Sequence, residues 1–462
     1  MKQPCYQACA RKTDKVTFTT RSDPIVFAIV FNAEEQRTQR FEPRNTQNTR
    51  KVFSRVEHVE TCREYGQMRI KIDILRHDAP LQLASSLAAA GDEDVEIEIA
   101  DVELCPNRIV PVVGIADAWF SRGHAVRFNV PPYSVGEKVL VGFNAHTLNA
   151  DSAVQEAFGR VWRFDNAREQ TNIVNAMVLE LDKTANLAKG VKQCFEWCLN
   201  EVTDNVLNHS RPQGGAHGYV MVQYVPSGGR LKICVFDTGI GLKESFVGSK
   251  YSPATAEEAI CLAVGKGVTN GKGQGNGLWG LHEMVKVSKR GKLHIRSDGA
   301  EYLFDPSRKV ESSRETWTLP GFPGTTTVDF QMECSEATTL QDIFGADYVS
   351  VDLWQEAHEQ EDGSLCLRVA ELAEGYGSRE SARKVRHVVE NAIDNDRKFV
   401  TLDFAGVDRC SSSFVDELVA KLVVKYGVLS YTRFFKVLNL VGLAQGLANL
   451  SAAQRLAQGE GV

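Results

Sequence analysis

The sequence lacks a hydrophobic run long enough to cross a membrane. The apolar stretch IVFAIVF at residues 25–31 is far shorter than the roughly 20 residues of a membrane-spanning helix. The chain does not open with a charged segment, an apolar segment and a small-residue cleavage site, so no secretory signal is indicated. We therefore predict a cytoplasmic protein with no membrane segment.

A strong net charge and paired metal-binding motifs are also absent. The formal net charge is −6, and the 43% apolar and 24% charged shares are ordinary for a soluble globular protein. Neither nucleic acid nor a membrane surface is indicated as a partner. The 11 cysteines are scattered, which predicts reduced thiols. Cys5 and Cys9 lie close together, but no second Cys or His pair follows at zinc-finger spacing, so we expect no metal site there.

The pattern of the chain changes at Met68. Residues 1–67 mix Arg, Thr, Gln and Asn with little periodicity, which predicts a poorly ordered or loosely attached extension. Met68 is therefore a candidate translation start. Residues 68–145 open with the alternating strand MRIKIDIL and continue with a strand, a helix from Pro106 and another strand, which predicts an αβ domain.

Two further domains are predicted. Residues 146–333 show helical periodicity at 151–164 and 186–209, then two strands joined by the turn PSGG, a loop-rich stretch, another helix and further strands. Residues 338–462 alternate strand and helix three times. The predicted fold class is α/β, an α+β sandwich in which a central domain is flanked by two αβ domains.

Polar side chains share one face of the predicted helix at 186–209. Glu201 and Asn205 stand one turn apart, and His209 follows one turn later. The opposite positions are apolar, so the polar face can be turned toward a ligand. A plain amphipathic helix with a solvated face has the same pattern.

A carboxylate and two glycines follow an apolar strand in VFDTGIGL. The strand ends at Asp237, and Gly239 and Gly241 come next on alternate positions. A carboxylate there can accept a hydrogen bond from an exocyclic amine such as that of adenine, and glycines permit close approach of a ligand. An ordinary Asp-Gly turn is the alternative.

A glycine-rich loop precedes the next predicted helix, which begins at Leu278. The glycines alternate with other residues: Gly271, Gly273, Gly275 and Gly277. Bare amide groups and the positive end of the helix stabilise a polyphosphate, and Lys272 adds a point charge. The loop is neither a Walker A motif nor a dinucleotide fingerprint, because it lacks GxxxxGK[ST] and does not follow the first strand of a βαβ unit.

In order and spacing, these three elements resemble the N-box (ExxxN), G1 box (DxGxG) and G2 box (GxGxGL) of the GHKL ATPases, the Bergerat-fold or histidine-kinase-like superfamily. The resemblance spans roughly residues 163–332. It includes Gly324 and Thr325, which are similar to the family's Gly-Thr before a closing strand. Residues 242–270 correspond to the family's ATP lid, where mobility is expected.

The resemblance implies ATP and Mg²⁺ as ligands. It implies that Glu201 is a general base, that Asn205 binds the metal ion and that Asp237 holds adenine. The other nucleotide-binding residues that it implies are Gly239, Gly241, Lys272, Gly273, Gly275, Gly277, Leu278 and Thr325. Histidine kinases of this superfamily carry a phosphoacceptor His on a preceding helical hairpin, and nothing upstream of residue 163 resembles one. His58 and His77 lack that context, and His282 falls within the helix after the glycine loop, where a packing role is expected.

The C-terminal segment VTLDFAGVDRCSSSFVDELVAKL resembles the STAS domains of anti-sigma factor antagonists. The resemblance implies a serine phosphorylated by a GHKL-type kinase, and Ser412 aligns with it. The family's Asp-Ser-Ser-Gly-Leu is here Cys-Ser-Ser-Ser-Phe at residues 410–414, and helix capping also explains a serine at this place. Residues 68–145 have a similar strand, turn and helix with Cys-Pro-Asn at 105–107, so they are interpreted as a degenerate STAS-like copy.

Two functions remain open at this point. The first is Mg²⁺-dependent phosphoryl transfer from ATP to water or to a serine of a STAS-like domain, as in the anti-sigma factor serine kinases that the chain resembles. The second is an ATP-gated scaffold, in which ATP orders the lid and changes contacts without turnover. Either function predicts a protein partner or a homodimer that forms through the STAS-like or ATPase domains.

Overall fold

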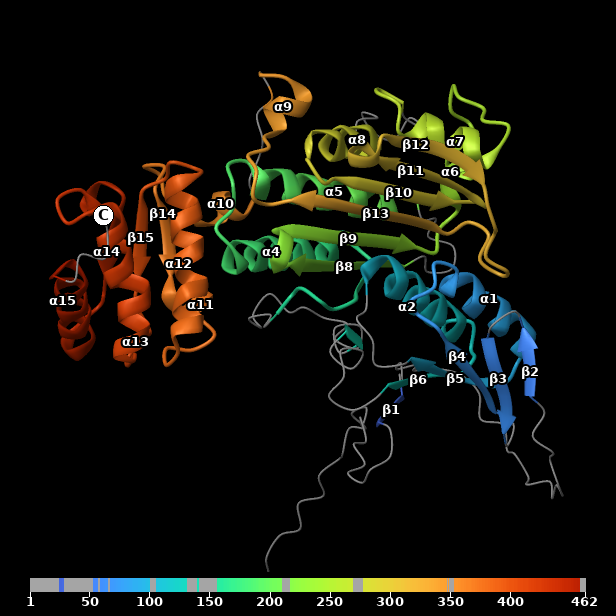
Figure 1. Ribbon diagram of the computed structural model, residues 1–462, viewed down its shortest axis with the longest axis horizontal. Coiled ribbons are helices and arrows are strands. Elements are labelled where there is room, and N and C mark those ends of the chain that lie inside the picture. The colour runs from blue at the N-terminus through green and yellow to red at the C-terminus, as the bar shows by residue number, and fades with distance from the viewer. Residues whose placement is uncertain are drawn as a thin grey trace, which may run out of the picture.

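Three β-sheets with attached helices make up the computed structural model, and the predicted mixed α/β class is confirmed. Figure 1 shows the central sheet between an N-terminal αβ unit and a C-terminal one. Cys5 and Cys9 lie outside the residues that the structure describes, which are 25–28, 53–56, 59–64, 67–99, 105–130, 139–140, 156–209, 217–268, 277–346, 348 and 353–457.

The N-terminal sheet has six strands in the order β1-β6-β5-β4-β3-β2. Its centre is parallel and is made of β4 (Gln67–Ile72), β5 (Asp94–Ile99) and β6 (Val126–Val130). The helices α1 (Ala79–Ala90) and α2 (Pro106–Phe120) connect these three strands, and the predicted helix start at Pro106 is confirmed. Antiparallel strands add to both edges: β1 (Ile25–Ala28), β2 (Phe53–Val56) and β3 (Val59–Glu64).

The N-terminal sheet includes strands from residues 1–67, the part of the chain predicted as a poorly ordered or loosely attached extension. β2 and β3 pair with each other, and β3 pairs with β4, so the sheet begins before Met68. A ladder is formed by backbone N–H and C=O groups, so strands can pair without a strict alternation of apolar side chains. Periodicity alone therefore missed these strands.

The central sheet has seven antiparallel strands in the order β12-β11-β10-β13-β9-β8-β7. Their bounds are β7 (Trp162–Phe164), β8 (Gly218–Val225), β9 (Arg230–Asp237), β10 (Lys292–Ser297), β11 (Ala300–Asp305), β12 (Val310–Glu315) and β13 (Thr326–Glu333). The helices of this domain are α4 (Ala167–Thr184), α5 (Val191–His209), α6 (Gly241–Ser245), α7 (Ala256–Ala263) and α8 (Gly277–Val287). Short turns η1 (Pro226–Gly228) and η2 (Pro306–Arg308) close two hairpins.

The two faces of the central sheet are buried by different parts of the chain. Along β9, Leu231, Ile233 and Val235 belong to the apolar core that includes α4, α5 and α8. The alternate residues Cys234 and Phe236 belong to a second core, which they share with the N-terminal unit. This is the two-residue period of a strand that is covered on both faces.

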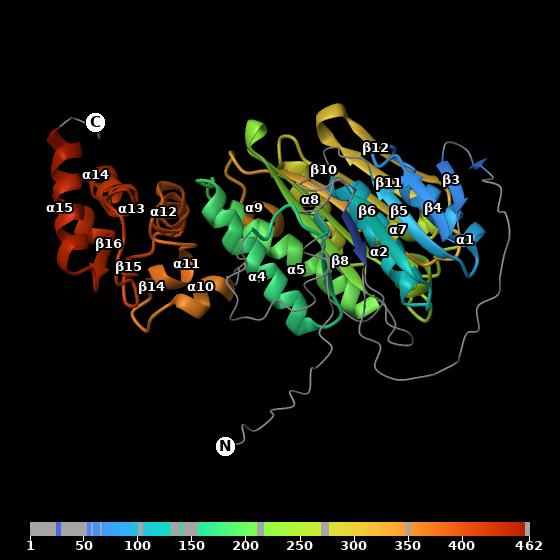
Figure 2. The ribbon, with the colours of Figure 1, turned by 90° about the horizontal axis from the view of Figure 1, so that it is seen from below.

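Helix α2 lies between the two sheets. Gly114 of α2 allows close contact, because a Cβ there would clash with the ring of Phe236 and lie 3.0 Å from Tyr219. Asp117 of α2 accepts hydrogen bonds from the Tyr219 hydroxyl and, at 2.9 Å, from the Arg163 guanidinium. Figure 2 shows α2 beside β8. The N-terminal and central units therefore share one buried layer.

One predicted helix is wrong. The described part of residues 151–164 contains no helix and ends in strand β7. Trp162 and Phe164 are both buried with a half-buried residue between them, which is a strand pattern. Helix formation starts after Asn166, whose side chain caps α4 by accepting a 3.0 Å hydrogen bond from the N–H of Glu169.

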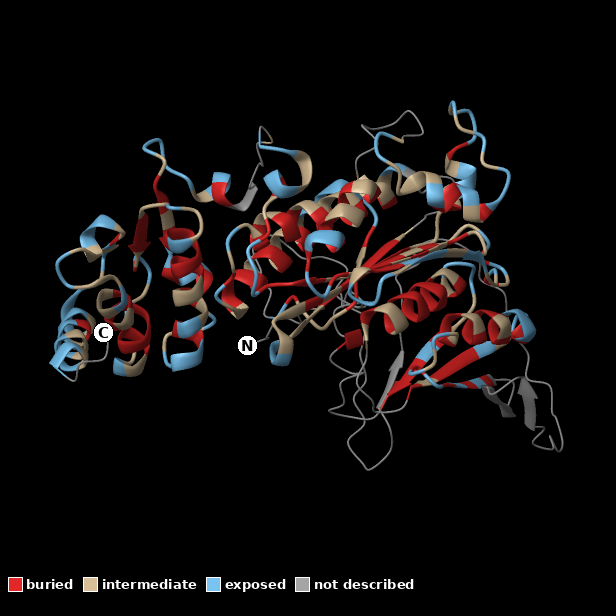
Figure 3. Ribbon diagram, turned by 45° about the horizontal axis from the view of Figure 1, so that its top comes forward, coloured by how far each residue is buried: buried red, intermediate tan, exposed pale blue. Residues whose placement is uncertain are grey.

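The C-terminal unit has three parallel strands, ordered β14 (Leu365–Arg368), β15 (Val400–Asp403) and β16 (Phe435–Leu438). Its helices are α11 (Val369–Leu372), α12 (Arg379–Asp394), α13 (Ser412–Val415), α14 (Lys421–Tyr426) and α15 (Gly442–Ala457), with a π-helical turn η3 (Asp416–Ala420) and a 3₁₀ turn η4 (Tyr431–Arg433). The linking segment contains α9 (Leu340–Phe344) and α10 (Leu353–His358). Figure 3 shows buried residues on the strands and on the helix faces turned toward them.

A buried polar contact joins the C-terminal unit to the central one. Asn391 of α12 accepts a 3.0 Å hydrogen bond from the N–H of Leu187 and donates to the carbonyl oxygens of Asp182 and Ala185. These bonds satisfy the backbone at the end of α4.

Among the described residues, no helix is both long and apolar enough to span a bilayer.

Candidate functional site

Helix α5 carries Glu201 and Asn205 beside its buried face. The predicted apolar side is confirmed, since it enters the core through Phe195, Cys198, Leu199, Val202 and Val206. Glu201 and Asn205 are half-buried, whereas Asp204 between them is exposed. The helix thus presents one carboxylate and one amide at the border of the core, one turn apart.

The first residue of α8 lies against these two side chains. A Cβ built on Gly277 would lie 2.7 Å from Oε2 of Glu201 and 3.5 Å from Nδ2 of Asn205. Any larger residue at this position would push the carboxylate away. Gly277, the last glycine of GxGxGL, therefore meets the two polar residues of ExxxN, although more than 70 residues separate it from them.

Glu201 is chemically available in this arrangement. Within the described part of the chain, its carboxylate makes no hydrogen bond or ion pair, and the same holds for the Asn205 amide. Burial raises the pKa of Glu201, and the nearby Asp204 carboxylate raises it further. A carboxylate with a raised pKa is a better proton acceptor at neutral pH than an ordinary one.

Asp237 ends strand β9 on the same face of the sheet. It continues the alternation of Ile233 and Val235, which face α5. Its carboxylate accepts a 2.8 Å hydrogen bond from the N–H of Gly239. Burial raises its pKa to about 7, although that hydrogen bond opposes the shift, and the charge of Asp298 adds to it. The second carboxylate oxygen is not used in this bond.

The closing strand places Thr326, rather than Thr325, on this face. Thr326 is the register partner of Asp237 and shares the face of Val328 and Phe330 in the core. Its hydroxyl is 3.0 Å from that of Ser297. Thr325 points the other way and donates a 3.2 Å hydrogen bond to the carbonyl of Phe322. Thr326 was missed because the motif does not reveal the strand register.

Close packing requires glycine at two positions near this turn, Gly324 and Gly241. A Cβ on Gly324 would lie 2.7 Å from the carbonyl oxygen of Gly239, so the turn after Asp237 rests on the start of β13. Gly241 has φ +80°, a conformation that side chains disfavour, and a Cβ there would clash with the Asp298 carboxylate.

Several other predicted residues have simple placements. Leu278 packs into the core beneath α8. His282 lies against Phe304, with ring centroids 4.1 Å apart, in agreement with the expected packing role. Lys272, Gly273 and Gly275 lie outside the described residues. The segment predicted as the lid contains α6 and α7, and Thr255 caps α7 by accepting a 3.1 Å hydrogen bond from the N–H of Glu258.

Comparison with known proteins identifies part of the chain. Residues 381–445 match the family model described as a STAS-like domain of unknown function (DUF4325). The C-terminal unit is a STAS-like domain. The match runs from α12 to the start of α15. No curated protein matches the chain.

The STAS-like domain separates the roles of its neighbouring serines. Ser411 is the N-cap of α13, where its hydroxyl oxygen accepts a 3.0 Å hydrogen bond from the N–H of Phe414 and its O–H donates to the carbonyl of Gly377. Ser412 is exposed, and its hydroxyl makes no hydrogen bond to the described residues. Capping therefore accounts for Ser411 but not for Ser412.

This division predicts different effects of two alanine substitutions. Ser411→Ala is expected to lower the free energy of unfolding by about 0.5–2 kcal/mol, because it removes a cap. Ser412→Ala is expected to change it by less than about 0.5 kcal/mol, as an exposed substitution does. Denaturant melts of the two variants measure the difference. Equal losses of stability would contradict this assignment.

Proposed function

We propose that the central unit binds ATP with Mg²⁺ and transfers its terminal phosphoryl group. The observation that carries the proposal is the meeting of Glu201, Asn205 and Gly277 on the helix face of the sheet, the face toward which Asp237 also points. The half-buried carboxylate of Asp237 accepts from the adenine amine through its unused oxygen. Thr326, its register partner, adds a hydroxyl beside the ring.

The phosphates belong at the start of α8, because the first turn of a helix offers N–H donors and a positive dipole end. The side-chain oxygen of Asn205 suits Mg²⁺, which prefers oxygen ligands and keeps several waters. When bound, the ion neutralises charge on the phosphates. In this proposal the phosphate oxygens of ATP supply further ligands of the ion.

In this proposal Glu201 takes the proton from the attacking hydroxyl of water or serine as the bond from that oxygen to the γ-phosphorus forms. The bond between the γ-phosphorus and its bridging oxygen breaks, and ADP leaves. The raised pKa of Glu201 suits proton acceptance near neutral pH. The N–H groups at the start of α8 would hold the phosphoryl group during transfer.

The acceptor that we propose is Ser412 of another molecule. Figures 1 and 2 both show α12 between the central unit and α13, the helix that begins at Ser412 of the same chain. Ser412 is exposed and has no structural task among the described residues. The related βαβαβ order of β4-β5-β6 and β14-β15-β16 also supports the proposal that residues 68–145 are a STAS-like copy that regulates the central unit.

A complementation assay with γ-labelled ATP tests this function. Glu201→Gln keeps the acceptor and loses the base, whereas Ser412→Ala keeps the base and loses the acceptor. Incubated alone, each variant is expected to stay unlabelled, and their mixture is expected to label only the Glu201→Gln chain, distinguished by a size tag.

Free phosphate is measured in parallel. Release without protein label indicates an ATPase that uses water. Label on Ser412→Ala alone would exclude this acceptor, and the absence of both products in wild type would favour the ATP-gated scaffold, which predicts binding without turnover.

A further inference from the structure

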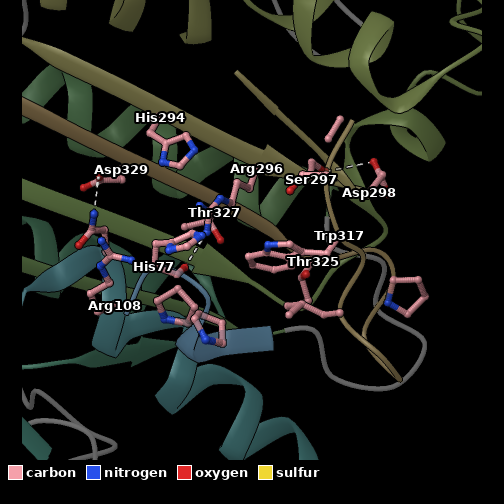
Figure 4. A pocket seen from close by; sticks show the side chains of 18 residues that line it. His77, Arg108, His294, Arg296, Ser297, Asp298, Trp317, Thr325, Thr327 and Asp329 are labelled. Atoms are coloured by element: carbon pink, nitrogen blue, oxygen red, sulfur yellow. Dashed lines mark hydrogen bonds between the residues drawn. The ribbon is translucent and has the colours of Figure 1, made fainter. Parts of the chain in front are cut away.

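A separate cavity lies on the other face of the central sheet, against the N-terminal unit. Its lining residues enclose about 780 Å³ of space, a volume that includes open solvent. Figure 4 shows side chains from both units around it. The alternation that turns Val328 toward α5 turns Thr327 and Asp329 into this cavity.

One wall of the cavity is cationic and aromatic, and it is formed by residues of β10 and by Trp317, which follows β12. Arg296 lies over the ring of Trp317, with its guanidinium carbon 4.9 Å from the ring centroid. It also donates to Glu301 at 3.1 Å, but that carboxylate is shared with Arg314 at 2.6 Å and with His294 at 3.1 Å. The single carboxylate of Glu301 therefore contacts two arginines and a histidine, so the positive charge at this wall is only partly balanced.

The opposite wall carries Arg108 of α2. Its guanidinium makes no hydrogen bond or ion pair to any residue that the structure describes. The neighbouring carboxyl of Asp329 accepts a 3.2 Å hydrogen bond from Asn107, and burial raises its pKa to about 6. Burial lowers the pKa of Arg108, and repulsion from Arg296 lowers it further. The two guanidinium groups therefore repel each other across the cavity, and the one carboxylate that pairs with Arg296 is shared with Arg314 and His294.

We propose that this cavity binds a small organic anion, a phosphate ester or a carboxylate, that carries a planar ring. The oxyanion lies between Arg108 and Arg296, whose planar guanidinium groups match phosphate and carboxylate oxygens. The ring lies against Trp317 and the apolar side chains of Pro111 and Leu319, which line the same cavity.

The bound anion would touch the turn between β10 and β11. In that turn, Ser297 accepts a 2.9 Å hydrogen bond from the N–H of Leu242, and Asp298 accepts one of 2.8 Å from the N–H of Lys243. Ser297 and Asp298 also line the cavity. The anion site therefore adjoins the first residues of α6, at the start of the predicted lid, while it remains on the other face of the sheet from Glu201.

Calorimetry on the full chain tests the site with two probes, uridine 5′-monophosphate and benzoate. At least one is expected to bind, and to bind more tightly than its matched fragment, uridine or inorganic phosphate for the first and benzyl alcohol for the second. Arg108→Gln should weaken the binding at least about tenfold through loss of a charge-assisted contact. Arg433→Gln, an exposed arginine far along the chain, is the charge-matched control and should have no effect.

Two further variants make the result decisive. Trp317→Leu should weaken binding of the ring-bearing probe but not binding of inorganic phosphate. It replaces Arg108→Gln as the test variant if Arg108→Gln does not fold. Asp237→Asn should bind the probe as wild type does, which separates this site from the proposed ATP site. Failure of both probes to bind, or equal affinity in wild type, Arg108→Gln and Trp317→Leu, would overturn the proposal.

Discussion

Replacing Glu201 with glutamine is expected to slow phosphoryl transfer by about two to four orders of magnitude, the usual contribution of a general base. Affinity for ATP should stay within about threefold, because the base acts on the attacking hydroxyl and not on the nucleotide. Glutamine has the same shape, so it fits beside Gly277 as the carboxylate does. Loss of rate without loss of binding is the result that distinguishes catalysis from scaffolding.

Single-turnover rates and calorimetry together measure this result. Glu315→Gln, an exposed glutamate of β12, is the matched control and should keep the wild-type rate. The rate of the wild type should fall as the pH drops through the raised pKa of Glu201, since protonation removes the base. A Glu201→Gln variant that turns over ATP at the wild-type rate would remove Glu201 from the mechanism.

Replacing Asp237 with asparagine is expected to weaken ATP binding by about 1–3 kcal/mol, which is roughly five- to 150-fold. The asparagine oxygen can still accept from the N–H of Gly239, as the carboxylate does at 2.8 Å. Its NH₂ group then faces the adenine amine, so two donors meet and neither is satisfied. Equilibrium binding at pH 8 measures the loss, with the exposed Asp94→Asn as the control.

The pH dependence of binding gives the same residue a second test. The pKa of Asp237 is about 7 without nucleotide, so its carboxyl is increasingly protonated as the pH falls below 7. Only the charged form offers both oxygens as acceptors, so wild-type affinity should be lower at pH 6 than at pH 8. The asparagine variant should show less of this change. An identical pH profile in both proteins would place the adenine elsewhere.

The site elements could be predicted from sequence because each is local. A helix that carries Glu201 and Asn205, a strand that ends at Asp237 and a helix after the glycine loop are all set by nearby periodicity and by glycines. The choice between Thr325 and Thr326 was not local. It depends on how β13 pairs with β9, and a shift by one residue exchanges the two faces of a strand.

The sequence did not reveal the strands before Met68 or the second cavity, and the reasons are related: both depend on pairing and packing that side-chain order does not record. β2 and β3 join their sheet through backbone bonds, which leave little trace in side-chain order. The cavity is formed where α2 meets β10 and β13, and Arg108 and Arg296 are almost 190 residues apart. Neither arginine stands in a motif. Only the packing of two sheets on one helix brings them together.

Because α2 packs between two sheets, it also determines how small a fragment of this protein can be and still fold as a soluble domain. A fragment cut at the predicted boundary near residue 146 would expose Tyr219, Met221, Cys234 and Phe236, which are at most 1% accessible in the whole chain. Such an apolar surface promotes aggregation. The central unit is therefore not a portable module, and recombination that moved it without α2 is expected to yield an insoluble product.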